Sequence, residues 1–85
     1  MKELRYVITD EIGIHARPAG LLVKEAKEFE SRITIEANDK SADATRIMSI
    51  MGLGVEKDTE IVVKAEGPDE VEAIIRMEEF LKENL

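Results

Sequence analysis

The sequence predicts an α+β fold in which helices cover one face of a mostly antiparallel sheet. Its 85 residues alternate between two hydrophobic periods, with apolar side chains at every second position in some segments and at every third or fourth in others. These periods indicate strands and helices in the order β-α-β-β-α-β-α. Every predicted strand has only one apolar face, so the helices should lie on one side of the sheet. The short connections favour antiparallel pairing, and the length suits one domain over residues 1–85.

The first strand and the first helix are separated by a polar break. Large apolar residues recur at every second position from Leu4 to Ile8, as in a half-buried strand, and residues 10–13 end that pattern. Pro18 is tolerated only in the first turn of a helix, where its missing N–H costs nothing. The helix should therefore begin at about Ala16, with His15 at the cap position. Its apolar face comprises Ala19, Leu22, Val23 and Ala26, and Phe29 continues it.

The middle of the chain predicts a hairpin followed by a short helix. Apolar residues alternate from Ile33 to Ala37, and Asn38-Asp39 is a tight-turn signal because both residues tolerate a left-handed backbone. A strand from Lys40 to Asp43 would complete the hairpin. An apolar-rich helix is then predicted from Thr45 to Leu53. The candidate caps of this helix are Asp43 or Thr45 at its start and Gly52 or Gly54 at its end.

The last third of the chain predicts a strand and a longer helix. Apolar residues alternate from Ile61 to Ala65, and Gly67-Pro68 ends this fourth strand. Asp69 and Glu72 have the spacing of a capping box, in which each side chain bonds the backbone N–H of the other residue. Glu78 falls inside the apolar arc of the helix and violates its pattern. That arc comprises Val71, Ile74, Met77, Leu81 and Leu85.

The composition excludes several classes of function. There is no cysteine and only one histidine, so disulfides, cysteine-based zinc sites and multi-histidine metal sites are excluded. We expect no cofactor. The net charge of −7 disfavours binding to nucleic acids or anionic membranes. No signal peptide is recognisable and no apolar run could cross a membrane, which predicts a cytoplasmic protein without membrane insertion.

The charge is unevenly distributed along the chain. Residues 66–83 hold seven acids and two bases, whereas residues 12–24 hold two bases and no acid. The acidic excess is therefore concentrated in the last helix, and the segment around the only histidine is free to meet negatively charged groups.

The segment Gly-Ile-His-Ala-Arg-Pro at residues 13–18 is the chemically dense part of the sequence. A helix start presents unpaired N–H groups and a partial positive charge, which together suit an anion. The backbone N–H groups of Ala16 and Arg17, with the Arg17 guanidinium, could hold a phosphoryl group received by His15, and Pro18 would fix the turn. Two alternatives remain at this point: plain anion binding, or a histidine that is merely polar at a loop–helix junction.

Residues 13–19 resemble the active-centre signature Gly-[Ile/Leu]-His-[Ala/Thr]-Arg-Pro-Ala of the HPr family, the histidine-containing phosphocarriers of the bacterial phosphoenolpyruvate–sugar phosphotransferase system. The run from Ile47 to Gly54 and the Ala65-Glu66-Gly67 step also look like this family, and so does the length of 85 residues. The resemblance covers the whole chain without a gap.

The resemblance implies an open-faced β-sandwich, a four-stranded antiparallel sheet with three helices packed on one face. It implies that His15 accepts a phosphoryl group on Nδ1, and not on the tele nitrogen, from phosphorylated enzyme I. His15 would then pass the group to the IIA domain of a sugar permease, while Arg17 stabilises the phosphoryl charge. Such a chain is a carrier with a transient phosphohistidine rather than a self-contained turnover enzyme. We expect it to be a monomer that binds no metal itself.

A partner-binding face is expected beside His15. The predicted helix from Thr45 is too short to bury all of its apolar residues, although a place in the core is the alternative for each of them. By resemblance, Ile47, Met48 and Met51 flank His15 and form an apolar docking patch, for which flexible methionine is well suited. The first helix would add residues that fall off its apolar face, which are Gly20, Leu21, Lys24 and Lys27.

Two positions depart from the family pattern. Many relatives carry a serine that a kinase phosphorylates at the position of Arg46, so the usual serine switch is absent here, and Ser49, one helical turn later, is a weak substitute candidate. Ile12 replaces a residue that is often small and polar. The alternative function is an HPr-like regulatory binding module, or a phosphorelay carrier outside sugar uptake. Purely regulatory relatives lack the histidine, whereas this chain keeps His15.

Overall fold

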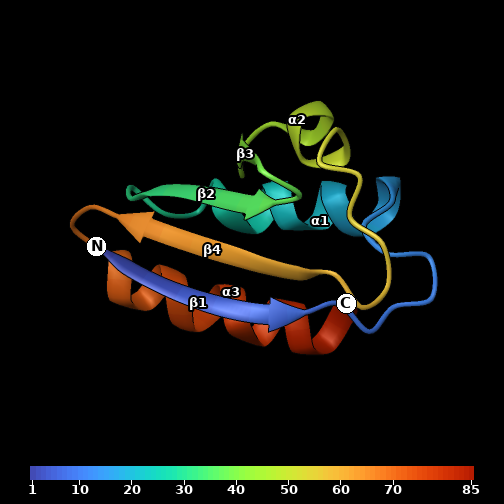
Figure 1. Ribbon diagram of the computed structural model, residues 1–85. Coiled ribbons are helices and arrows are strands. Elements are labelled where there is room, and N and C mark those ends of the chain that lie inside the picture. The colour runs from blue at the N-terminus through green and yellow to red at the C-terminus, as the bar shows by residue number, and fades with distance from the viewer.

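The computed structural model describes residues 1–85 and contains the seven elements in the predicted order. Four strands form one antiparallel sheet in the order β1-β4-β2-β3 (Figure 1). This arrangement confirms the predicted antiparallel sheet. The strands are β1 (Lys2–Val7), β2 (Arg32–Ala37), β3 (Lys40–Asp43) and β4 (Glu60–Glu66).

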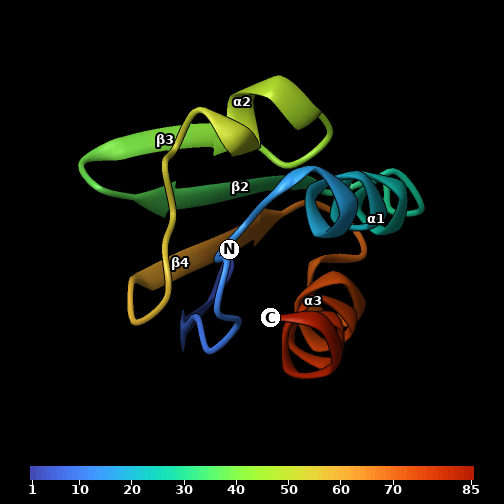
Figure 2. The same cartoon turned by 90° about the vertical axis from the view of Figure 1, so that its right-hand side faces the viewer.

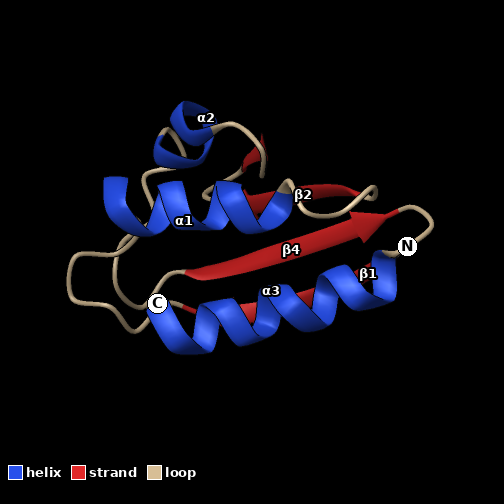
Figure 3. Cartoon of the chain, turned by 180° about the vertical axis from the view of Figure 1, so that it is seen from behind, coloured by secondary structure: helices blue, strands red, loops and turns tan.

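The helices lie on one side of the sheet, as predicted. In the edge-on view, α1 and α3 run beside one another along one face of the strands, while the other face is uncovered (Figure 2). The shortest helix, α2, packs against α1 and β3 (Figure 3). None of the helices combines the length and apolar character needed to cross a bilayer. The helices are α1 (Ala16–Ala26), α2 (Ile47–Met51) and α3 (Glu70–Asn84).

The core lies between the sheet and the helices. The alternating residues of β2 and β4 that face the helices are fully buried, and they include Ile33, Ile35, Ile61 and Val63. Each such side chain contributes roughly 1.5–3 kcal/mol by leaving water. Leu22 of α1 is also fully buried against this layer. The alternating apolar residues of the strands and the apolar faces of the helices therefore pack together in one cluster of 21 buried apolar residues.

The first helix begins as predicted and ends earlier. It starts at Ala16 with His15 at the N-cap, and its buried residues include Ala19, Leu22 and Ala26. Phe29 does not continue the helix: it lies just after the turn that follows Ala26, partly buried against the core.

The short helix is shorter than predicted and capped differently. It spans Ile47–Met51 and has Arg46 at its N-cap, so neither Asp43 nor Thr45 caps it. Asp43 instead accepts hydrogen bonds from the N–H (2.8 Å) and the hydroxyl (2.6 Å) of Thr45 in the turn before the helix. Gly52 ends the helix, which was one of the two predicted possibilities.

The capping box predicted for α3 is wrong. Asp69 occupies the N-cap position, but its carboxylate makes no bond to the helix. It accepts hydrogen bonds from the N–H groups of Glu30 (2.9 Å) and Ser31 (2.8 Å) and from the Ser31 hydroxyl. Asp69 thereby ties the start of α3 to the loop between α1 and β2, a partner that local spacing with Glu72 does not reveal. Glu70 accepts the Gly67 N–H at 3.1 Å instead.

The buried arc of α3 is shifted from the predicted one. Ala73 and Phe80 lie within it, whereas Val71 is 52% exposed, so the prediction for Val71 was wrong. Residues seven apart share a helix face, and Glu78 therefore leaves the arc together with Val71. Glu78 is exposed near Lys82, with 3.9 Å between their charged atoms. The shift removes the apparent violation of the pattern.

Candidate functional site

His15 stands at the junction of a loop and α1. Its backbone is extended (φ −115°, ψ −177°), and its carbonyl accepts the first bond of the helix from the Ala19 N–H at 3.0 Å. The side chain is partly exposed and makes no capping hydrogen bond to the helix. An imidazole held at its Cα but not engaged by the helix remains available as a nucleophile.

The first turn of α1 offers hydrogen-bond donors beside His15. The N–H groups of Ala16 and Arg17 come too early in the helix to have an acceptor four residues back, and no other group of the protein accepts them. Pro18 has no N–H and is buried, which anchors the turn against the core. The Arg17 side chain is exposed and takes part in no ion pair. Two backbone donors and one guanidinium therefore adjoin the imidazole, a set that suits a phosphoryl group.

The loop before His15 is held by a second loop. Gly13 has φ +81°, and a side chain there would lie 2.8 Å from the Glu56 Cα and also strike the Val55 carbonyl. The Ile14 N–H donates to that same carbonyl at 3.1 Å. Gly13 is therefore needed for packing between loops, which fixes where the chain enters α1.

Helix α1 divides into a buried face and an exposed face. The buried face includes Leu22, as described above, while Arg17, Leu21, Lys24 and Lys27 are exposed and Gly20 is partly so. A Cβ added to Gly20 would lie 3.7 Å from the Ile47 Cδ1 atom. The exposed face of α1 is therefore continuous with the start of α2.

Helix α2 exposes three of its four large apolar side chains. Ile50 is fully buried, whereas Ile47 and Met51 are each 38% exposed and Met48 is 76% exposed. One turn and a half of helix can direct only one such residue into the core, as sequence reasoning anticipated. We call the exposed set of Leu21, Ile47, Met48 and Met51 the α1–α2 patch. Ser49 is also exposed on α2, and Arg46 is exposed at its start.

Two residues bear on this region in ways that the sequence did not reveal. Ile12 is 68% exposed in the loop leading to His15 and adds a further apolar side chain there. Its place in a polar break was the available signal. Asn38 donates from Nδ2 to the carbonyls of Leu53 (2.9 Å) and Gly54 (3.2 Å), which holds the segment that follows α2. No sequence signal links Asn38 to that segment.

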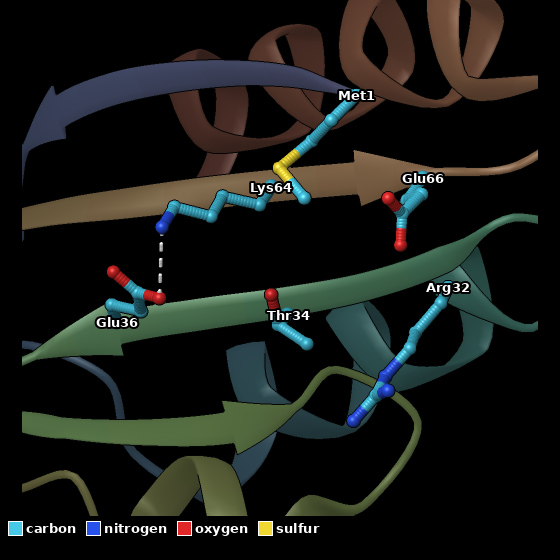
Figure 4. A pocket seen from close by; sticks show the side chains of 6 residues that line it. All are labelled: Met1, Arg32, Thr34, Glu36, Lys64 and Glu66. Carbon is cyan, nitrogen blue, oxygen red and sulfur yellow. Dashed lines mark ion pairs between the residues drawn. The ribbon is translucent and has the colours of Figure 1, made fainter.

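The hollows of the surface lie on the open face of the sheet. In one of them, Lys64 Nζ lies 3.1 Å from a carboxylate oxygen of Glu36 (Figure 4). Neither hollow is lined by His15 or by any residue of α1 or α2. A site outside any hollow suits a macromolecular partner better than a small ligand. The first hollow is lined by Met1, Arg32, Thr34, Glu36, Lys64 and Glu66, and the second by Glu36, Ala37, Asp39, Lys40, Ser41, Glu60 and Val62.

Taken together, the fold and the site define a small carrier-type module. A sheet covered by helices on one face presents a histidine at a helix start, with free backbone donors in the same turn and an exposed apolar patch on α1 and α2. No cluster of three or more histidine, cysteine, aspartate or glutamate residues is arranged to hold a metal ion.

The chain belongs to the HPr family of phosphocarrier proteins of the phosphotransferase system. The family model described as "PTS HPr component phosphorylation site" matches residues 2–83. The chain is also 45% identical over 74 residues to phosphocarrier protein HPr of Mycoplasma capricolum, a match that covers 87% of this chain and 83% of that protein.

Solved structures agree with this assignment. A histidine-containing phosphocarrier protein from Mycoplasma superposes with a TM-score of 0.94 at 39% identity, over 96% of this chain and 93% of that one. HPr-C-His from Thermoanaerobacter tengcongensis superposes with a TM-score of 0.91 at 41% identity, over 96% of this chain and 92% of that one. A chain of an HPr dimer from the same organism superposes with a TM-score of 0.77 at 41% identity, over 98% of this chain and 95% of that one. The expected HPr fold is thereby confirmed.

Proposed function

We propose that this chain is a cytoplasmic, monomeric carrier that accepts a phosphoryl group on His15 from phosphorylated enzyme I and passes it to the IIA domain of a sugar permease. The observation that carries the proposal is His15 at the N-cap of α1, with no capping bond of its own and with the free N–H groups of Ala16 and Arg17 beside it. Membership of the HPr family supports the same role.

The transfer is a displacement at phosphorus. The Nδ1 lone pair of His15 forms the new bond to phosphorus while the bond to the donor breaks, and the donor keeps that electron pair. The N–H groups of Ala16 and Arg17 and the Arg17 guanidinium then hold the added negative charge, and Pro18 keeps the turn in place. Passing the group on reverses these events, with a nucleophile of the IIA domain attacking phosphorus. The carrier ends as it began.

Partners are proposed to dock on the α1–α2 patch. Its side chains are exposed without a partner in the chain, and Met48 is the most exposed. One protein must fit two different partners in turn, and methionine side chains can repack against each of them. Lys24 and Lys27 of α1, together with Gly20, would complete the rim on which acidic partners settle.

The proposal is tested by labelling. The chain is incubated with enzyme I and radiolabelled phosphoenolpyruvate, and the product is examined for an acid-labile, base-stable label. We expect stoichiometric label on the wild-type chain and none on His15→Ala, whose folding is checked by circular dichroism. Absence of label on the wild-type chain, or a label that survives His15→Ala, would reject the proposal.

The same assay distinguishes the proposed carrier function from the two alternatives, a phosphorelay outside sugar uptake and a regulatory binding module. A chain that is labelled but cannot pass the group to any IIA domain would point to a phosphorelay outside sugar uptake. A chain that takes no label yet binds a partner, and loses that binding on Met48→Ala, would point to a regulatory binding module.

A further inference from the structure

Arg46 breaks a local rule of helix stability. It occupies the N-cap of α2 with an extended backbone (φ −122°, ψ 106°), and no side-chain bond caps the helix. Serine, threonine, aspartate and asparagine are preferred at this position, and a cation is unfavourable at the positive end of a helix. A residue that opposes its own element without a local compensation is expected to serve another purpose.

The Arg46 guanidinium has no carboxylate within ion-pair distance, although its charge is one of the lesser causes that lower the pKa of Asp43. It takes part in no ion pair, and Asp43, the nearest acid in the sequence, is already bonded to both donors of Thr45. Arg76 shows the contrast, because it contacts Glu25, Glu79 and Glu83 at 2.9–3.5 Å. The guanidinium of Arg46 is therefore available to a partner, whereas that of Arg76 is engaged within the fold.

Arg46 joins other free cations on one surface. Arg17, Lys24 and Lys27 on the exposed face of α1 are likewise in no ion pair. Arg46 precedes Ile47, whose side chain packs toward Gly20 of α1, and Lys24 lies one helical turn beyond Gly20. The four cations therefore border the α1–α2 patch from both helices.

We propose that Arg46 determines partner specificity: its guanidinium meets carboxylates on a phosphoryl-transfer protein that presents an apolar centre with an acidic rim. The interaction rests on the proposed carrier function and deepens it. Such a contact raises the rate of productive encounter and disfavours partners with a basic rim. It does so at the expense of the stability of α2.

The test compares two variants that each remove one positive charge with one variant that keeps it. Arg46→Asn provides a good cap without charge, Arg46→Lys retains the charge, and Arg32→Asn removes an exposed, unpaired cation on the opposite, open face of the sheet. The second-order rate constant of transfer from phosphorylated enzyme I is measured by quench flow at low and high salt, and the melting temperature is measured for each chain.

We expect Arg46→Asn to lower the rate constant about five- to tenfold at low salt, with the difference shrinking as salt screens the charges. The same variant should melt a few degrees higher, because α2 gains a cap. The rate constant of Arg46→Lys should remain within about twofold of the wild-type value, and that of Arg32→Asn should be unchanged.

Three results would overturn the inference. The first is a wild-type rate for Arg46→Asn at low salt. The second is an equal loss in Arg32→Asn, which would show that only net charge matters. The third is a lower melting temperature for Arg46→Asn, which would assign Arg46 a structural role. If the wild-type chain takes no label at all, the proposed carrier function fails first and the inference fails with it.

Discussion

The position of His15 is determined by its backbone rather than by partners of its imidazole. The ring makes no capping bond, whereas the loop before it is held by Gly13 and by the bond from the Ile14 N–H to the Val55 carbonyl. A rigid backbone limits where the nucleophile can be, while its ring stays free to react. Val55, on a loop distant in the sequence, therefore helps to set the geometry on which the proposed phosphoryl transfer depends.

Arg17→Ala should slow transfer without unfolding the chain. Arg17 is exposed and in no ion pair, so little of the fold depends on its side chain. The phosphoryl group on His15 would lose a cation two residues away, and transfer from enzyme I should fall on the order of a hundredfold. Quench flow measures the rate, and circular dichroism checks the fold. Arg17→Lys, which keeps the charge but not the forked donor, should be intermediate, and normal transfer by Arg17→Ala would refute this role.

Gly13→Ala should destabilise the chain far more than Gly54→Ala. Both glycines have positive φ, at +81° and +66°, but a Cβ on Gly54 would meet nothing within 4 Å, whereas one on Gly13 would strike the backbone of Val55 and Glu56. We expect a loss on the order of 3 kcal/mol for Gly13→Ala and about 1 kcal/mol for Gly54→Ala. Urea unfolding followed by circular dichroism measures both. Equal losses would show that backbone strain alone matters at Gly13.

For single residues, the sequence reveals a role when all the residues that define this role are neighbours along the chain. His15 and Arg17 are recognisable because the proline that fixes the helix start is three residues from the histidine, so one short segment holds the whole signal. The role of Gly13 is not recognisable, since its reason lies in the backbone at Val55. Ile12 was noticed only as a departure from the family pattern, and its exposure becomes apparent only when the loop is seen folded.

The elements of this fold depend on one another through their ends. The turn between β2 and β3 places Asn38 and Asp39 at φ 52° and 62°, the left-handed pair that a tight hairpin needs. Asn38 also bonds the carbonyls of Leu53 and Gly54. The hairpin thus holds the segment after α2, and the next residue of that segment, Val55, holds the loop before His15.

Asn38→Gly should therefore cost stability, although glycine accepts the same backbone conformation. The variant loses both bonds from Nδ2, and we expect a loss of about 1 kcal/mol. Asp39→Gly is the matched control, because Asp39 shares the left-handed conformation but makes no side-chain hydrogen bond; it should be neutral or slightly stabilising. Urea midpoints at pH 7 compare the two. An equally large loss of stability in Asp39→Gly would show that the loss comes from the conformation of the turn and not from the Asn38 hydrogen bonds.

Element types follow from the sequence better than element ends do. The alternation in β2 and β4 and the apolar arc of α1 predict their burial, because every residue on one face contributes to the pattern. The ends depend on single contacts. Asp69 has the local spacing of a capping residue, yet its carboxylate bonds Ser31, 38 residues away. Likewise α2 begins two residues later than predicted because Asp43 and Thr45 are used in the preceding turn.

Across the whole molecule, charges of opposite sign are separated. The acids of α3 give that helix its negative character, and Arg76 joins it to α1 through two bonds to Glu25 at 2.9 and 3.0 Å. Arg17, Lys24 and Lys27 of α1, together with Arg46, are exposed and form no ion pair. A chain with a net negative charge can in this way still carry a local group of cations, which is the surface we propose for acidic partners.

The carboxylates that hold the fold together should make it sensitive to acid. Four of them have a pKa lowered by hydrogen bonds made in the folded state. The leading donors are the Arg76 guanidinium for Glu25, the Thr45 hydroxyl for Asp43, the Ser31 hydroxyl for Asp69 and the Gly67 N–H for Glu70.

A folded-state pKa below the unfolded value means that the unfolded chain binds protons first as the pH falls. The stability that each carboxylate contributes is complete above its ordinary pKa, which is 3.8 for aspartate and 4.5 for glutamate. It is lost as the pH falls through the lower, folded value. We therefore expect the urea midpoint to be flat from about pH 8 to 5.5 and to fall between about pH 5 and 2.

Asp69→Asn isolates one of these contributions. Its amide can no longer offer two carboxylate oxygens to Glu30, Ser31 and the Ser31 hydroxyl, so the variant should be less stable than the wild type at pH 7. The two chains should converge towards pH 2, where the wild-type carboxylate is protonated as well. The difference between them is the informative quantity, because every other carboxylate titrates in both. Glu72→Gln, which removes an exposed carboxylate that makes no hydrogen bond, is the matched control for the loss of one charge at the start of α3. A gap between Asp69→Asn and the wild type that stays constant down to pH 2 would show that Asp69 acts through the shape of its side chain rather than through its charge.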